Sequence, residues 1–174
     1  MDVASFLAQA MRLKRTPRTG WKDVGVPAPE SVADHAWGLS LLALVAARET
    51  GLDAGKAAQL AIVHDLAEAI TGDLRPGDVD AAEKRLRENA AMAELAARLP
   101  DASRKHLLAL WAEYESLGSP EARLVRELDK VEMAATARMY EDEGFPRDKL
   151  ARFRESARRA VADPRLQALL LRYE

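Results

Sequence analysis

Two histidines and an aspartate interrupt the most apolar segments of the sequence. His64 and Asp65 stand side by side within residues 57–67, and His35 lies just before the apolar segment 36–47. A carboxylate buried without a partner costs several kcal/mol, and residues 57–67 contain no lysine or arginine to pair with it. A divalent cation would provide that partner, because imidazole nitrogens and carboxylate oxygens are its usual ligands where thiolates are lacking. The alternative interpretation is that the histidines are hydrogen-bonded core residues and that the His64–Asp65 pair has arisen by chance.

Two further carboxylates favour the metal interpretation. Glu68 follows His64 by four positions and Asp65 by three, so the three side chains lie on neighbouring faces within one helical turn. Three ionisable groups on an otherwise apolar helix indicate a site rather than a solvated face. Asp129 can point inward as a fourth ligand, since it flanks an apolar stripe made of Leu124, Val125, Leu128, Val131 and Met133. Taken alone, Asp129 carries little weight, because Asp and Glu are frequent in this segment.

A basic cluster near the N-terminus allows two interpretations. It consists of Arg12, Lys14, Arg15 and Arg18. One interpretation is a solvated helix end, where cations complement the helix dipole. The other is a rim that attracts an anion, on which the guanidinium of Arg18 binds a phosphate through two hydrogen bonds. We favour phosphate binding for Arg18 and the solvated surface for the other three. We also expect a solvated surface for His106 and for Arg152, Arg154, Arg158 and Arg159.

The order of these candidates, His35, then His64–Asp65, then Asp129, resembles that of the HD-domain superfamily of metal-dependent phosphohydrolases. The surrounding segments are more specific. They resemble the HD-domain 5′-deoxynucleotidase group, which includes YfbR-like bacterial enzymes and relatives of HD-domain-containing protein 2; the segments are 13–21, 30–36, 63–74, 110–115 and 127–133. The run from His64 to Asp73 is the most discriminating part. The similarity extends from about residue 5 to about residue 160, nearly the whole chain.

The resemblance implies a role for each candidate. The implied ligands of one divalent metal ion are His35, His64, Asp65 and Asp129. The implied catalytic residues are Glu68, as acid or base, and Asp65. Arg18 would orient the substrate phosphate, Trp21 would border the deoxyribose, and Asp73 would contact the sugar hydroxyl. In the small bacterial enzymes the aromatic residue directly follows the arginine, whereas two residues separate Arg18 from Trp21 here.

The implied chemistry is consistent with general principles. A phosphate monoester dianion repels hydroxide, so its hydrolysis needs charge neutralisation and a positioned nucleophile. A divalent metal polarises a phosphoryl oxygen and lowers the pKa of bound water from 15.7 toward ~7. Nitrogen and oxygen ligands together suit Mn²⁺, Co²⁺, Fe²⁺, Ni²⁺ or Zn²⁺, and the sequence does not choose among these ions and Mg²⁺. In a dry pocket the pKa of Glu68 should rise, which suits protonation of the leaving 5′ oxygen; the alternative is a helix-surface glutamate.

Helices must position these residues, because strand patterns are nearly missing and Ala, Leu, Arg and Glu dominate. We predict an all-α fold, which the resemblance specifies as an HD-domain helical bundle of about six to eight helices. Residues 1–174 are expected to form a single domain with its core at about 30–135, and with N- and C-terminal helices packed on that core. The predicted helices cover residues 2–13, 32–50, 54–69, 79–98, 101–117, 119–142, 147–162 and 164–172. Residues 14–31, rich in proline and glycine, are expected to connect two helices without helical character of their own.

The predicted helices differ in polarity and have identifiable ends. Residues 36–47 and 57–67 are apolar around most of the helix circumference, which predicts that both are buried at the centre. Residues 79–98 are highly charged and are expected to lie outside, with an apolar stripe of Val79, Leu86, Met92 and Leu95. Helix ends are predicted at an N-cap Ser31, a terminating Gly51 and an N-cap Asp53.

Composition and charge exclude several classes of protein. The chain has 174 residues, 48% hydrophobic and 31% charged, which is typical of one globular domain. The net charge of −2 provides no global attraction to nucleic acid or an anionic membrane. The longest apolar stretch, residues 39–47, is far short of the ~20 residues that a membrane helix needs. The chain has no cysteine, and residues 1–11 do not form a signal peptide pattern, so we expect a cytoplasmic protein.

We therefore predict a metal-dependent phosphomonoesterase that converts deoxyribonucleoside 5′-monophosphates into deoxynucleoside and phosphate. A second possibility is another HD-domain activity, either deoxynucleotide triphosphohydrolysis or phosphodiester cleavage. We disfavour it because only Arg18 and Arg75 lie near the expected pocket. A third possibility is a helical interaction protein that binds metal without catalysis. The resemblance also implies a homodimer, and neither nucleic acid nor a membrane is expected as a partner.

Overall fold

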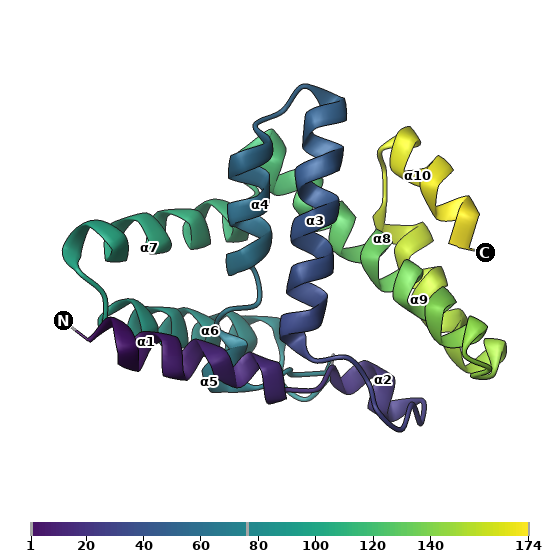
Figure 1. The fold of residues 1–174 in the computed structure, drawn as a ribbon, viewed down its shortest axis with the longest axis horizontal. Helices are drawn as coiled ribbons and strands as arrows, with labels where there is room; N and C mark the ends of the chain where they lie inside the picture. Colours follow the sequence, from purple (N-terminus) through teal and green to yellow (C-terminus); the bar gives the residue numbers. More distant parts are fainter. Residues whose placement is uncertain (1, 76, 174) are drawn as a thin grey trace.

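The structure, a computed structural model, describes residues 2–75 and 77–173. Over those residues the chain is helical apart from its connections and one isolated antiparallel bridge between Pro17 and Ser31, so the all-α prediction is confirmed (Figure 1). The α-helices are α1 (Val3–Ala10), α2 (Thr19–Asp23), α3 (Val32–Thr50), α4 (Ala54–Val63), α5 (Glu68–Thr71), α6 (Ala81–Ala96), α7 (Asp101–Ser116), α8 (Pro120–Asp142), α9 (Arg147–Ala160) and α10 (Pro164–Leu170). Two 3₁₀ helices follow α1 and α10: η1 (Met11–Arg15) and η2 (Leu171–Tyr173).

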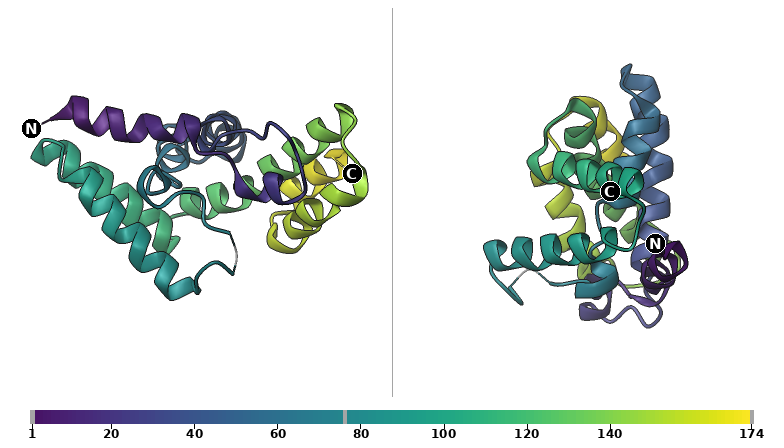
Figure 2. Two further views of the ribbon diagram at one scale, coloured as in Figure 1. Left: turned by 90° about the horizontal axis from the view of Figure 1, so that it is seen from below. Right: turned by 90° about the vertical axis from the view of Figure 1, so that its left-hand side faces the viewer.

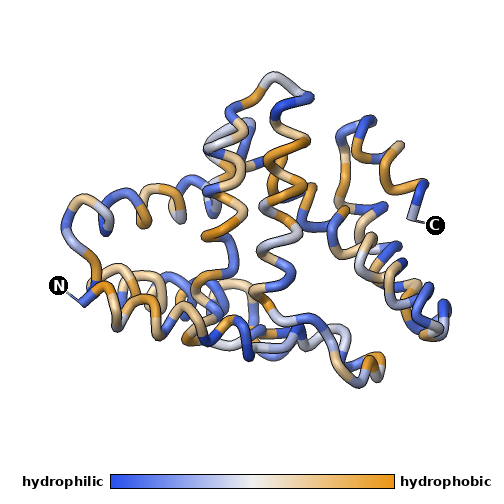
Figure 3. The backbone as a smooth tube through the Cα atoms, viewed as in Figure 1, coloured by the Kyte–Doolittle hydropathy of each residue, from blue (hydrophilic) through white to orange (hydrophobic). Residues whose placement is uncertain are grey.

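The helices α3 and α4 form an antiparallel pair at the centre, and this pair is one of the segments richest in hydrophobic residues (Figure 3). The hydroxyl of Ser31 accepts the N–H of Asp34, and the Asp34 carboxylate accepts the N–H of Ser31 at 2.8 Å, which is a capping box. Gly51 ends α3 with φ 74°, a left-handed conformation that favours glycine. Asp53 caps α4 by accepting the N–H of Lys56 at 2.9 Å. All three predicted helix ends are confirmed.

The long helix α8 packs against both members of this pair. Ser119 caps its N-terminus and Pro120 occupies its first turn, where a missing N–H costs nothing. Val125, Leu128 and Val131 of its predicted apolar stripe are completely buried. The same face of α8 therefore lies against α3 and α4, and side chains next to this stripe are brought to the junction of the three helices.

The remaining helices flank this core on two sides. The N-terminal side holds α1, α5, α6 and α7, and the C-terminal side holds α9 and α10, so the two termini lie at opposite ends of the long axis (Figures 1 and 2). The charged residues of α6 are mostly exposed, as predicted for residues 79–98. Leu86 does not belong to the buried stripe, since 71% of its surface is exposed. Burial on α6 is confined to its second half, at Ala91, Met92, Leu95 and Ala96.

The expectation of a non-helical connection over residues 14–31 is wrong, because η1 extends to Arg15 and α2 covers Thr19–Asp23. A small separate core explains the second of these helices. The ring of Trp21 packs against Tyr140 and Phe153, with centroid distances of 5.3 and 3.9 Å, and is 1% exposed. The energy for this short helix comes from packing on α8 and α9, which local sequence patterns do not reveal.

Residues 36–47 and 57–67 lie at the centre as predicted, but the expected burial does not extend to every side of these helices. One side of α3 is exposed, at Trp37, Leu41, Leu44 and Val45, and Ile62 of α4 is 57% exposed. The residues on α3 follow one another at intervals of four, three and one, so they form a single stripe on one face of the helix. We call these exposed residues of α3, together with Ile62 of α4, the apolar face of α3 and α4.

The expectation that Arg154 lies on a solvated surface is wrong, because its side chain is buried, with 5% exposed. Its Nη1 lies 2.9 Å from Oε2 of Glu141. Arg152, Arg158 and Arg159 are exposed as expected. Among the described helices, none combines the length and the hydropathy that crossing a membrane requires.

The central role of α3 leads to a stability prediction. Leu39 is completely buried in α3, so Leu39→Ala leaves a cavity and is expected to lower the free energy of unfolding by ~2–5 kcal/mol. Leu86→Ala on exposed α6 should change it by less than ~1 kcal/mol. Urea unfolding followed by circular dichroism measures both. A loss at position 39 no larger than that at position 86 would contradict the assigned core.

Candidate metal centre

His35 is held at the fourth position of α3, fully buried in the core. The capping box fixes the start of α3 and hence the direction in which this side chain points. Its Nδ1 lies 2.6 Å from Oε2 of Glu132 on α8. An ionised carboxylate only accepts hydrogen bonds, so in a neutral ring Nδ1 carries the hydrogen and Nε2 carries a lone pair.

His64 lies at a break in the chain, where the prediction of one continuous helix over 54–69 is wrong. The helix α4 ends at Val63, residues 64–67 form a turn, and α5 begins at Glu68. The last carbonyls of a helix lack partners within it, and the carbonyl of Ala61 accepts a hydrogen bond from Nδ1 of His64 at 2.7 Å. A carbonyl also only accepts, so the second imidazole likewise keeps its Nε2 lone pair free. The break lets His64 and Asp65, adjacent in sequence, face the same point.

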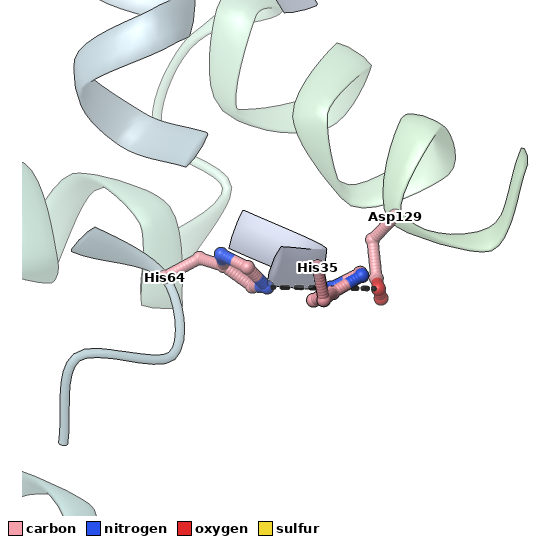
Figure 4. Close-up of side chains that lie close together, drawn as sticks. All are labelled: His35, His64 and Asp129. Atoms are coloured by element: carbon pink, nitrogen blue, oxygen red, sulfur yellow. Dashed lines mark hydrogen bonds and ion pairs between the residues drawn. The ribbon is translucent and has the colours of Figure 1, made fainter. Parts of the chain in front are cut away.

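Four electron-pair donors converge as a result. Nε2 of His35 lies 3.3 Å from Nε2 of His64 and 3.2 Å from Oδ1 of Asp129 on α8 (Figure 4). Oδ2 of Asp65 lies 3.0 Å from Nε2 of His64 and 3.9 Å from Nε2 of His35. With both rings neutral, lone pairs and negative oxygens face one another without a hydrogen between them. This arrangement requires positive charge, either from a proton on one of the rings or from a bound cation.

The electrostatics of the cluster agree with that requirement. Burial and Arg18 oppose protonation of His35, but hydrogen bonds to Asp129 and Glu132 outweigh them and raise the pKa of His35 to about 10. Burial alone would raise the pKa of Asp129, yet His35 and Lys130 hold it well below its ordinary value. The pKa of Asp65 is likewise lowered against burial, by His64 and Arg18. The carboxylates stay ionised, and positive charge between them is strongly favoured.

A divalent metal ion fits these residues. One ligand atom from each of His35, His64 and Asp129 lies within 4.8 Å of the other two, and the Asp65 oxygen adjoins the two imidazole nitrogens. Two nitrogens and two oxygens form a donor set that suits first-row divalent metals. The four residues predicted from the sequence as ligands are therefore together, although they come from three separate segments of the chain.

Glu68 is a buried carboxyl group beside this cluster. It is 3% exposed, and its Oε2 has no hydrogen-bond partner within the described part of the chain. Burial, followed by the negative charges of Asp65 and Asp73, raises the pKa of Glu68 well above its ordinary value. Such a group keeps its proton to a higher pH than an exposed glutamate does and can give up that proton in a reaction.

Arg18 lies at the same site and points toward the ligands. Its Nη1 donates to Oδ2 of Asp65 at 3.1 Å. Burial opposes its charge, but Asp65, Asp129 and Asp73 outweigh burial and raise the pKa of Arg18 above its ordinary value. Arg12, Lys14 and Arg15 are exposed, as expected for a solvated surface.

Asp73 and Trp21 occupy different settings. The Asp73 carboxylate accepts hydrogen bonds from the N–H and the hydroxyl of Thr19, at 2.5 and 2.9 Å, and so ties the chain after α5 to α2. The indole N–H of Trp21 donates to Glu30 at 2.8 Å, and its ring is almost wholly buried. Both residues line a cavity that opens at the cluster. Their contacts with a sugar stay predictions. His106 is exposed and bonded to Gln59, as expected of a surface residue.

A cavity of about 900 Å³ opens at these residues. It is of a size that holds a small organic ligand. His64, Asp65, Glu68 and Asp129 line it together with Arg18. Three of the four candidate ligands, the buried acid and the guanidinium thus line one concave space, and His35 lies buried behind them.

Two acidic residues next to the cluster, Glu30 and Glu132, were not predicted from the sequence. Glu132 accepts from His35, and Glu30 lies near both, so that ligand atoms of these three residues are also within 4.8 Å of one another. Burial and the charge of Glu132 raise the pKa of Glu30 to about 7. The available signal for Glu132 was its spacing of three from Asp129, which places both on one face of α8. Glu30 carried no comparable signal.

Comparisons with known proteins agree with this geometry. The family model described as HD domain matches residues 10–168. The chain is 44% identical to the 5′-deoxynucleotidase HDDC2 of Danio rerio, over 83% of this chain and 73% of that protein. It is 39% identical to the 5′-deoxynucleotidase HDDC2 of Bos taurus, over 99% of this chain and 84% of that protein. A crystal structure of a Pyrococcus horikoshii OT3 protein superposes with a TM-score of 0.78 at 33% identity, covering 98% of this chain and 97% of that one.

The candidate centre leads to a prediction about metal and stability. Adding Mn²⁺ or Co²⁺ to chelator-stripped protein should raise its melting temperature, because a ligand at 100 times its Kd stabilises the folded state by ~2.7 kcal/mol. Asp129→Asn removes one ligand charge and should reduce the shift strongly. Asp142→Asn, on the exposed end of the same helix, should leave the shift intact. Differential scanning calorimetry measures all three, and an undiminished shift in Asp129→Asn would contradict the ligand set.

Proposed function

This chain belongs to the HD-domain family, and from that premise we propose that it is a 5′-deoxynucleotidase. It hydrolyses deoxyribonucleoside 5′-monophosphates to deoxynucleoside and phosphate and depends on a divalent metal ion. The carrying observation is the set of four converging donor atoms from His35, His64, Asp65 and Asp129, next to a cavity that also contains Glu68 and Arg18. The proposal is consistent with the name of the relatives, each of which is a 5′-deoxynucleotidase.

The metal site is the first part of the proposal. His35, His64, Asp65 and Asp129 hold one divalent ion, whose identity the donor set leaves open among Mn²⁺, Co²⁺, Fe²⁺, Ni²⁺, Zn²⁺ and Mg²⁺. When bound, such an ion neutralises phosphate charge and makes water a better nucleophile at neutral pH. The depressed pKa values of Asp65 and Asp129 keep both carboxylates ready to bind it.

Glu68 supplies the proton. Water attacks phosphorus, the bond between phosphorus and the 5′ oxygen breaks, and the electron pair of that bond stays on the oxygen. The protonated Glu68 carboxyl gives its proton to this oxygen, so that a neutral hydroxyl leaves. The raised pKa of Glu68 makes the acid form available, and its unpartnered Oε2, judged over the residues described, keeps that oxygen free for substrate.

Arg18 orients the phosphate. Its guanidinium stays charged and lines the cavity beside Asp65, at 3.1 Å. A planar guanidinium can bind two phosphate oxygens at once while it keeps its place next to the ligands. Asp73 and Trp21, which both line this cavity, are proposed to contact the sugar.

The alternative activities have less support. The cavity wall carries additional cations, which a triphosphate would need, but Arg75, Lys84 and Lys130 each form an ion pair with a nearby carboxylate, at 3.0, 3.2 and 3.0 Å. Arg18 is paired in the same way, with Asp65 at 3.1 Å, so the preference for a single phosphate rests on the names of the relatives. A non-catalytic scaffold does not account for a buried carboxyl group with a raised pKa, Glu68, in the same cavity as candidate metal ligands.

A homodimer and a cytoplasmic location complete the proposal. The apolar face of α3 and α4 supports association, because Trp37 is 72% exposed and Leu41, Leu44 and Val45 continue the same stripe. Contiguous exposed apolar side chains are characteristic of protein interfaces. The cytoplasmic location rests on the cysteine-free sequence.

The role of Glu68 can be tested by substitution. Glu68→Gln has nearly the same shape and cannot donate a carboxyl proton, so kcat for phosphate release from dAMP should fall by ~10²–10⁴-fold. Metal binding should be retained, because Glu68 is outside the ligand set. Colorimetric phosphate measurement across a panel of metals gives the first result, and calorimetric metal titration gives the second.

A matched control and a substrate panel complete this experiment. Glu88→Gln changes a glutamate at the outer wall of the same cavity and should reduce kcat far less. Wild type should release phosphate from dAMP, and should not release triphosphate from dATP. Release of triphosphate, or wild-type protein that is inert with every nucleotide and every metal, would contradict the proposed activity.

The dimer proposal has its own test. Leu41→Glu puts a charge in the middle of the apolar face of α3 and α4 and should convert a dimer into a monomer without unfolding it. Leu86→Glu, at a leucine outside this face that is 71% exposed against 50% for Leu41, should leave the dimer unchanged. Light scattering after gel filtration gives the molar mass. A wild-type mass of one chain would contradict the proposal.

A further inference from the structure

The carboxylate of Glu132, at the core of the molecule, takes no part in the mechanism proposed above. Glu132 of α8 is 9% exposed, and its Oε2 lies 2.6 Å from Nδ1 of His35. The opposite nitrogen of the same ring, Nε2, faces His64 and Asp129. Glu132 therefore contacts the side of His35 that points away from the candidate metal.

The second oxygen of Glu132 is also held. The hydroxyl of Thr136, one turn further along α8, donates to Oε1 at 3.2 Å. With one oxygen on His35 and the other on Thr136, the plane of the carboxylate is fixed from two sides. A side chain that is fixed in this way can fix its partner in turn.

A glycine makes room for this carboxylate. Gly38 lies one turn after His35 in α3, and a Cβ atom at this position would be 2.9 Å from Oε1 of Glu132 and 3.5 Å from its Cγ. A glycine inside a helix is less favourable than alanine. The absence of a side chain at position 38 thus serves the close approach of Glu132 to α3.

The effect of Glu132 on His35 follows from the chemistry of imidazole. A carboxylate on Nδ1 selects the tautomer with hydrogen on that nitrogen, leaves the lone pair on Nε2, and makes Nε2 a stronger base. It also prevents rotation of the ring about its bond to Cβ. Asp129 lies three residues before Glu132, so one face of α8 supplies both a ligand and the group that orients another ligand.

We propose that Glu132 is a positioning residue for the metal site and acts through His35. Gly38 is required in this proposal because the carboxylate of Glu132 lies against α3 at that position. The inference rests on the proposed metal site and adds two residues to it. Glu132 touches neither substrate nor metal in this role, and its effect is expected in metal affinity first and in activity only as a consequence.

The experiment compares three variants by their affinity for Co²⁺, measured by competition with a chromophoric chelator. Glu132→Ala removes the acceptor and should weaken Co²⁺ binding by ~10–100-fold. Glu132→Gln keeps an oxygen that accepts from Nδ1 but loses the charge, so its affinity should lie between those of wild type and Glu132→Ala. Glu121→Gln, a glutamate of the same helix that is 8% exposed and contacts Lys56, should bind Co²⁺ within twofold of wild type.

The visible absorption spectrum of bound Co²⁺ provides a second measurement. It reports the ligand geometry directly, so it should change in Glu132→Ala and stay unchanged in Glu121→Gln. A merely structural role for Glu132 would alter the stability of the protein and leave the affinity and spectrum of the folded fraction as in wild type.

Gly38→Ala tests the same idea without removing a polar group. The added methyl group displaces Oε1 of Glu132, so Co²⁺ affinity should fall several-fold. The metal-free protein should not lose thermal stability, because alanine favours the helix more than glycine does. This variant keeps the proposal testable where Glu132→Ala does not fold.

The outcomes separate this proposal from the one on which it rests. Wild-type protein that binds no Co²⁺ overturns the metal site and, with it, the role of Glu132. Wild-type protein that binds Co²⁺, with Glu132→Gln and Gly38→Ala both within twofold of it, overturns only the role of Glu132. A loss in Glu121→Gln equal to that in Glu132→Gln also overturns it, because the effect would then belong to any buried glutamate of α8.

Discussion

Four electron-pair donors, from two histidines and two aspartates, lie close together in the core, and the rest of the molecule depends on this constraint. The backbone carbonyl of Ala61 and the carboxylate of Glu132 each take the hydrogen of one imidazole ring. In their neutral forms both rings then present lone pairs to each other and to two aspartates. Such a cluster is stable only with positive charge at its centre, and a divalent ion supplies more of it than a proton does.

The helices are arranged so that this repulsive cluster can exist. The capping box sets the position of His35, and the end of α4 at Val63 turns His64 and Asp65 toward it. The apolar stripe of α8 packs on the same pair of helices and brings Asp129 with it. Burial of large apolar surfaces at the three-helix junction offsets the cost of placing charged groups next to one another.

The same burial divides the work among the carboxyl groups. Asp65 and Asp129, close to imidazoles and to cations, have lowered pKa values and stay ionised. Glu68 has a raised pKa, because its burial and the negative charges of Asp65 and Asp73 outweigh the cations Arg18 and Lys84. Two types of carboxyl group, one that binds a cation and one that donates a proton, are what hydrolysis of a phosphate monoester needs.

The sequence by itself determined the helical class and most helix ends, because caps and apolar periodicity are local signals. His35, His64 and Asp65 stood out as polar residues in or beside apolar runs, whereas the complete ligand set with Asp129 came from the resemblance to HD-domain enzymes. Only the tertiary structure decided the break after Val63, the short helix around Trp21, the burial of Arg154 and the exposure of one face of α3. Each of these depends on which surfaces meet, and a helix that is apolar all round does not reveal which side is covered. Glu132 and Gly38 show the same limit: 94 residues separate them in the sequence, and only the packing of α8 on α3 brings the carboxylate to the glycine.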